Sequence, residues 1–251
     1  MVYKLYKVIF LSTLLLINSA CFRSIQIKKG LHKAPSAVSK NVTHHRVIAG
    51  ETLYSIAFEY GRDPRDVARW NRIRRPYTIF PKQNLRIIPI SSDKKTNKRI
   101  AKSTTRIVSP TIKYKPVRNS KYHVSNKKLK WQWPTKGKIV STFSLRDPGR
   151  RGIDIVGTKG QPINAAAAGW VVYRGSGLRG YGNLIIIKHN ETYFSAYAHT
   201  ENMVVKEKEK VKLGQRIADM SNTSSDKTKL HFEIRRNGKP INPLGTLPKR
   251  R

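Results

Sequence analysis

Two stretches decide how this chain folds: Gly149–Asp154, which reads Gly-Arg-Arg-Gly-Ile-Asp, and Lys229–Glu233, which reads Lys-Leu-His-Phe-Glu. Each stretch places a residue of a zinc-binding type, Asp154 in the first and His231 in the second, beside short apolar runs. Short apolar runs bounded by turn residues predict β-strands. The pattern is typical of strands that present a metal site, but a third ligand is missing.

The sequence around these two stretches predicts an all-β domain over residues 131–249. Strand-forming runs alternate with turn residues, and helical periodicity of useful length is absent. Strands are expected at 139–143, 153–155, 162–163, 169–173, 183–188, 193–197, around Val211, at 217–218 and at 231–234.

This segment resembles the lysostaphin-type (LytM-like) zinc metallopeptidases. Active members of that family carry the motif H-x-G-x-D and, far downstream, the motif H-x-H. In this chain the first motif reads Arg-Arg-Gly-Ile-Asp at 150–154, and the second reads Lys-Leu-His at 229–231. The resemblance therefore implies a peptidase-like domain in which two of the motif histidines have been replaced.

The resemblance also implies a role for each matched position. Arg150 occupies the position of the first zinc ligand, Asp154 that of the second and His231 that of the third. His199, in Tyr-Ala-His, matches one catalytic histidine, and Lys229 replaces the other. Asp154, His199 and His231 are thus expected to be vestigial, and no residue is expected to be catalytic.

The charge of Arg150 argues against a bound metal ion. A guanidinium does not deprotonate, and at about 4 Å it would repel a divalent ion by roughly 8 kcal/mol at the effective dielectric of a protein cleft. We therefore expect neither a metal nor another cofactor. Asp154 is expected to pair with Arg150 instead, with Lys229 nearby.

A smaller module is predicted over residues 44–90. Its elements are a strand starting at His45, a helix capped by Thr52 and stopped by Gly61, a helix started by Asp63-Pro64, and a strand at 85–88. This α+β order, with the phrases G-E-T-L-Y-S-I-A and R-W-N, resembles a LysM domain. The resemblance implies a peptidoglycan ligand bound through its glycan strands, and it does not identify the residues that contact sugar.

Histidines outside the motifs carry weaker signals. His44 and His45, at the start of the first LysM strand, are expected to face solvent. His189 ends a strand, and no partner for it is evident in the sequence.

The N-terminus predicts export. Two lysines precede an apolar run at 8–17 that is too short for an ordinary membrane span, and Asn-Ser-Ala precedes Cys21. We interpret 1–20 as a lipoprotein-type signal peptide and Cys21 as the lipidation site. The alternatives are ordinary cleavage that leaves a free N-terminal segment, or an uncleaved anchor.

The remaining segments are polar and basic. Residues 21–43 are expected to form a flexible tether, and 91–130 a basic linker. The formal net charge of +37 favours anionic partners such as wall polymers or lipid headgroups, and export makes nucleic acid an unexpected partner.

Taken together, the chain resembles the NlpD-type murein hydrolase activators. That resemblance rests on residues 152–248 and on the degenerate motifs. It implies a non-enzymatic protein, anchored to the outer membrane through Cys21, that binds peptidoglycan. It also implies that the chain activates a periplasmic N-acetylmuramoyl-L-alanine amidase at the division septum. The former substrate groove would then bind the amidase through Arg150, Tyr181, Tyr197, His199, Lys229 and Arg235. Two alternatives remain open, a zinc-dependent peptidoglycan endopeptidase and a passive wall-binding lipoprotein.

Overall fold

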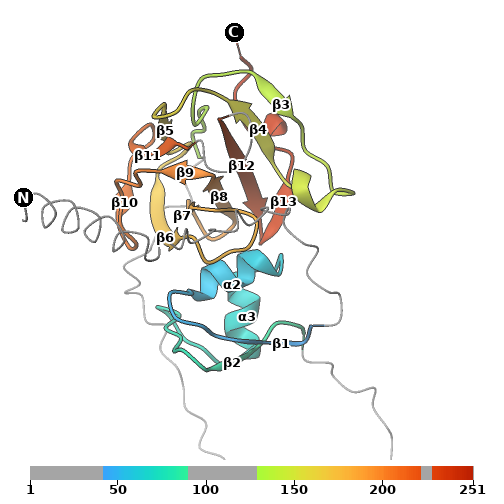
Figure 1. The fold of residues 1–251 in the computed structure, drawn as a ribbon. Helices are drawn as coiled ribbons and strands as arrows, with labels where there is room; N and C mark the ends of the chain where they lie inside the picture. Colours follow the sequence, from blue (N-terminus) through green and yellow to red (C-terminus); the bar gives the residue numbers. More distant parts are fainter. Residues whose placement is uncertain (1–41, 90–128, 222–227, 251) are drawn as a thin grey trace, which may run out of the picture. The chain divides into compact units, whose positions relative to one another are not determined.

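The computed structural model describes residues 42–89, 129–221 and 228–250, which contain both predicted modules (Figure 1). The predicted signal peptide, Cys21 and almost all of the predicted tether and basic linker lie outside these residues. Within the described ranges, no helix is long and apolar enough to cross a membrane.

The first module has the predicted strand–helix–helix–strand order, which confirms the LysM fold class. Strand β1 (His44–Arg46) pairs antiparallel with β2 (Asn84–Arg86), and helices α2 (Leu53–Glu59) and α3 (Pro64–Trp70) lie between them in the sequence. The apolar side chains of both helices and of β2 form one core. This core is made of Val47, Leu53, Ile56, Ala57, Val67, Ala68, Leu85 and Ile87.

The ends of the two helices follow from local chemistry. The Thr52 side chain accepts a hydrogen bond from the Ser55 backbone N–H, and the Ser55 hydroxyl bonds back to the Thr52 backbone, so the pair forms a capping box. Asp63 caps α3 by accepting from the Arg65 N–H, and Pro64 occupies the first turn, where its missing N–H is harmless. Sequence alone placed both starts correctly.

The second module is built from strands, as predicted. Strands β9 and β13 and the two 3-10 turns were not predicted. The elements are β3 (Ile139–Ser141), η1 (Pro148–Arg150), β4 (Ile153–Val156), β5 (Pro162–Asn164), β6 (Gly169–Gly175), β7 (Leu184–Lys188), β8 (Tyr193–Ala198), β9 (Thr200–Glu201), β10 (Lys210–Val211), β11 (Arg216–Met220), β12 (Lys229–Arg236), β13 (Lys239–Ile241) and η2 (Pro243–Gly245).

These strands form two sheets (Figure 1). The larger sheet has the order β10-β6-β7-β8-β12-β4-β3, with β13 also paired to β12, and the smaller has the order β5-β11-β9. All pairings are antiparallel, so each strand can present one face to a core and the other to a site.

Strand β12 is central to the larger sheet, and its side chains alternate strictly in character. Leu230, Phe232 and Ile234 are fully buried in the main core. Because successive side chains of a strand point to opposite faces, the residues between them share the other face. That other face carries Lys229, His231, Glu233 and Arg235.

Candidate functional site

The site predicted from the two motifs forms where β12 pairs with β4. The antiparallel register sets His231 directly opposite Asp154 on one side and opposite Ala198 of β8 on the other. Residues that lie 77 positions apart in the sequence are thereby brought into contact. The structure thus brings the two motif residues together.

Asp154 is held by two partners from β12. Its Oδ1 lies 2.7 Å from His231 Nδ1, and Lys229 Nζ donates to its Oδ2 at 2.6 Å. Burial by itself would raise the pKa of Asp154, but the hydrogen bonds and charges of His231 and Lys229 outweigh it and lower the pKa to about 2. Asp154 is therefore a carboxylate bound between two cationic groups.

His231 lies between two carboxylates. Its Nδ1 faces Asp154, and its Nε2 lies 3.3 Å from Oε1 of Glu233. Burial opposes the charged imidazole, but Asp154 and Glu233 together raise the pKa of His231 to about 9. At neutral pH both ring nitrogens thus carry protons and donate, so His231 is an imidazolium.

Glu233 continues this series of paired charged groups into the interior of the domain. It is fully buried and accepts from Arg235 Nε at 2.8 Å and from the Tyr181 hydroxyl at 2.9 Å. Burial opposes its ionisation, but Arg235 and His231 lower the pKa of Glu233 to about 2. The pKa of Tyr181 is raised, first by burial and then by the Glu233 charge.

The five groups form one line of alternating charge, which we call the charge ladder. In order it comprises Lys229, Asp154, His231, Glu233 and Arg235, and each member contacts the next. Buried charges of this kind are tolerated only when each is paired and hydrogen-bonded. Among the described residues, no buried side-chain polar atom lacks a partner.

Comparison with known proteins identifies the family to which this chain belongs. Residues 148–243 match the model of peptidase family M23, and residues 45–87 match the LysM domain model. The chain is 40% identical to the lipoprotein NlpD/LppB homolog of Pseudomonas aeruginosa, in an overlap covering 86% of this chain and 82% of that one. The chain belongs to the NlpD family.

The chain is also similar to other known proteins. The murein hydrolase activator NlpD of Escherichia coli is 39% identical, over 82% of this chain and 68% of its own length. The uncharacterized lipoprotein YgeR of Escherichia coli is 44% identical, over 81% of this chain and 80% of its own length. Among solved structures, Helicobacter pylori Csd3 overlaps 48% of this chain and 33% of its own length, at 32% identity and a TM-score of 0.42.

One expectation for this NlpD-family chain was wrong: Arg150 does not pair with Asp154. Asp147 caps the 3-10 turn η1, and Arg150 ends it. From there its Nε donates to the Thr142 carbonyl and its Nη2 to the Thr142 hydroxyl, both at 2.9 Å. The Arg150 guanidinium therefore stabilises the loop that follows β3. Lys229 occupies the position beside Asp154 that was expected for Arg150.

The structure places the predicted groove residues on different faces. Tyr197 is fully buried in the main core, where its hydroxyl accepts from the Ala166 N–H, so it lies on the opposite face of the sheet from His231. Tyr181 and Arg235 are buried beside Glu233. His199 follows β8, with its ring centroid 6.4 Å from that of His231.

Three side chains were missed or misjudged from the sequence. Glu233 was not singled out, although the period-2 pattern of β12 sets it on the face of His231. His189 was left without a partner, whereas it is fully buried and bonded to the Ala168 carbonyl and the Ser195 hydroxyl. His45 was expected to face solvent but is half-buried, because Glu51 and Tyr60 contact it.

Proposed function

We propose that this chain is a non-catalytic activator of a periplasmic N-acetylmuramoyl-L-alanine amidase. In this role the LysM domain binds peptidoglycan, and the M23-type domain docks the amidase and promotes septal wall splitting and daughter-cell separation. The names of the NlpD relatives and the two domain matches support this role. The observation that supports it most is the charge ladder, in which Lys229 and Glu233 contact the two motif residues Asp154 and His231.

The residues present do not fit a catalytic zinc ion. Such a site takes three neutral or anionic protein ligands and leaves one position for water. Here the paired strands offer only one carboxylate and one imidazole, and the two imidazole nitrogens face Asp154 and Glu233. A zinc ion would have to displace the Lys229 ammonium from Asp154 and deprotonate His231. We therefore derive no peptidase step for this domain.

An activator of this kind acts through differential binding. It must bind the open form of the amidase more tightly than the closed form, because equal affinity for both would leave the populations of the two forms unchanged. A rigid surface suits this task, since little conformational entropy is lost when it binds. The charge ladder supplies such rigidity, because each of its charged groups fixes the next.

The docking surface that we propose lies at the end of the larger sheet formed by β4 and β3. Tyr181, Tyr197 and Arg235 are buried, so we leave them out of it. Arg150 and the partly exposed Lys229 supply positive charge, and Leu145 is 73% exposed in the loop braced by Arg150. An exposed leucine on a surface that also carries these cations fits an amphipathic, acidic helix or loop of the amidase.

The test is amidase activation by the Arg150→Glu variant, with Lys212→Glu as the matched control. Lys212 is exposed and follows β10, at the opposite end of the sheet order from β3. We expect Arg150→Glu to lose at least about tenfold in activation, because one reversed charge contact is worth more than about 1.4 kcal/mol at such a surface. Sacculus binding and Lys212→Glu should remain at wild-type levels, and full activation by Arg150→Glu would refute the surface.

We further propose that Cys21, outside the described residues, anchors the chain to the outer membrane. Relatives are named lipoproteins, which supports an envelope location. Metabolic labelling with a clickable fatty acid should mark the wild-type chain and leave the Cys21→Ala variant unmarked. Labelling of both would place the lipid elsewhere.

A further inference from the structure

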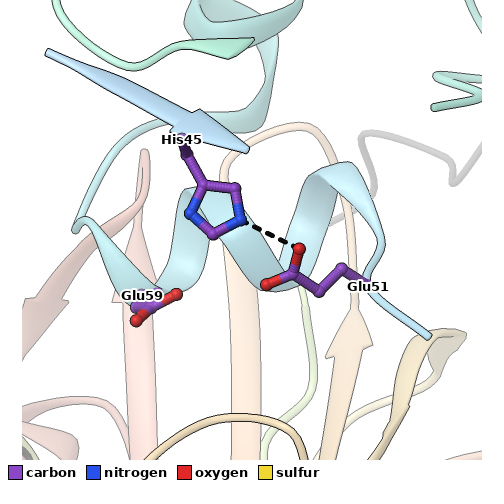
Figure 2. Close-up of side chains that lie close together, drawn as sticks. All are labelled: His45, Glu51 and Glu59. Carbon is purple, nitrogen blue, oxygen red and sulfur yellow. Dashed lines mark hydrogen bonds and ion pairs between the residues drawn. The ribbon is translucent and has the colours of Figure 1, made fainter. Parts of the chain in front are cut away.

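Three metal-ligand side chains converge in the LysM module, away from the charge ladder. His45 lies on β1, Glu51 lies in the turn before α2, and Glu59 is the last residue of α2. One ligand atom from each lies within 4.8 Å of the other two. Figure 2 shows the imidazole of His45 lying between the two carboxylates.

Hydrogen bonds already orient the His45 imidazole for metal binding. Its Nδ1 lies 3.0 Å from the Tyr60 hydroxyl, and its Nε2 lies 2.9 Å from Glu51 Oε2. Ligating histidines in proteins usually have their second nitrogen fixed by an outer partner in this way. Glu51 is itself held, since its Oε2 accepts from the Ile48 N–H at 2.8 Å. Two of the three side chains are therefore pre-positioned.

The negative charge of the two carboxylates in the cluster also favours binding of a cation. The whole chain has only 14 acidic residues against 51 basic ones, and two of the acids meet here around one histidine. The side chains of His45 and Glu51 are 13% and 11% exposed, so water screens their charges poorly.

We propose that His45, Glu51 and Glu59 bind a divalent transition-metal ion of the zinc class. One imidazole nitrogen with two carboxylate oxygens is a donor set that suits zinc, with water completing the coordination. At metal–ligand distances of about 2.0–2.2 Å, tetrahedral ligand atoms lie about 3.3 Å apart, which side-chain rotation of Glu59 would provide. The ion would join β1 to both ends of α2.

Zinc titration of the full chain tests this site without reference to amidase activity. The protein is stripped with a chelator, dialysed and titrated with zinc chloride by calorimetry. We expect one zinc ion per chain at this site, and an affinity at least about 100-fold lower for Glu59→Gln, which removes one ligand. Asp66→Asn, in the same module but outside the cluster, should bind like the wild type.

A second variant separates ligation from folding. Tyr60→Phe keeps all three ligands and removes only the outer hydroxyl, so its affinity should fall by about 10- to 100-fold. Zinc should also raise the melting temperature of the wild type and leave that of Glu59→Gln unchanged. No zinc binding by the wild type, or equally tight binding by Glu59→Gln, would overturn the proposal.

Discussion

The Nδ1 atom of His231 lies 2.7 Å from Oδ1 of Asp154 across the β12–β4 pair. Two side chains of types that bind zinc in proteins thus contact each other directly. The second oxygen of Asp154 accepts from Lys229, and the second nitrogen of His231 faces Glu233. On our proposal, the positive charge that a metal ion would bring is supplied by the chain itself, and the strands keep their geometry without one.

The raised pKa of His231 predicts that the folded state loses stability as the pH rises. Folding raises this pKa from its ordinary 6.5 to about 9, so the folded state holds the proton more tightly than the unfolded state. The contribution is fully present below about pH 6.5 and is lost as the pH rises through 9, and it amounts to at most about 3 kcal/mol. Urea unfolding at pH 6 and pH 9.5 measures it.

The control for this pH dependence is His231→Gln. This variant cannot gain the proton, so its stability should change much less over the same interval. An equal loss in both proteins would show that another group titrates. Below about pH 4 the sign reverses, because the lowered pKa of Asp154 makes its contribution disappear as the pH falls towards 2.

Removing the Glu233 charge should cost far more than removing an exposed one. Glu233→Gln leaves His231 and Arg235 buried without their shared anion, and breaking such a pair costs about 3–5 kcal/mol. Asp66→Asn breaks an exposed pair with Arg69 and should cost less than about 1 kcal/mol. Urea unfolding compares them, and similar losses would mean that the charge ladder contributes little to stability.

Gly152 should tolerate no side chain, because β4 begins beside it and packs against β12. A Cβ there would meet the Phe232 carbonyl oxygen at 2.2 Å and Glu233 Cγ at 2.9 Å. Gly152→Ala should therefore cost about 1–3 kcal/mol, which lowers the melting temperature by several degrees. Gly245→Ala is the matched control, since nothing lies within 4 Å of its Cβ. Equal melting temperatures for the two variants would show that the strands can separate freely.

On the proposed docking surface, Leu145 should matter for amidase activation and not for folding. It is 73% exposed, so Leu145→Asp should leave the melting temperature within about a degree of the wild type. Loss of an apolar anchor at an interface costs about 2 kcal/mol, so amidase activation should fall roughly 30-fold. Val204→Asp, at a residue 50% exposed between β9 and β10, is the control. Activation that falls equally in both variants would exclude a local docking role.

The LysM helices were predicted well because their signals are local. Thr52 caps α2 through a residue three positions away, and Asp63-Pro64 starts α3 within two positions. Such contacts need no knowledge of the rest of the fold. The same locality allowed most strands of the second module to be placed from their short apolar runs.

The partners within the candidate site could not be predicted in the same way. Whether Asp154 meets Arg150 or Lys229 depends on the β4–β12 register and on the turn η1, which directs Arg150 towards Thr142. Neither the strand register nor the turn can be inferred from the motif residues alone. Glu233 was within reach of prediction, because the period-2 alternation of β12 sets it on the face of His231.

The most direct test of the central claim is dye release from labelled sacculi, using the purified chain, a candidate amidase, and both together. If the chain is a non-catalytic activator, it should release no dye alone, the amidase should release little, and the mixture should release at least about tenfold more than the sum. Release by the chain alone, abolished by a chelator, would contradict the account, and so would a mixture no more active than the amidase by itself.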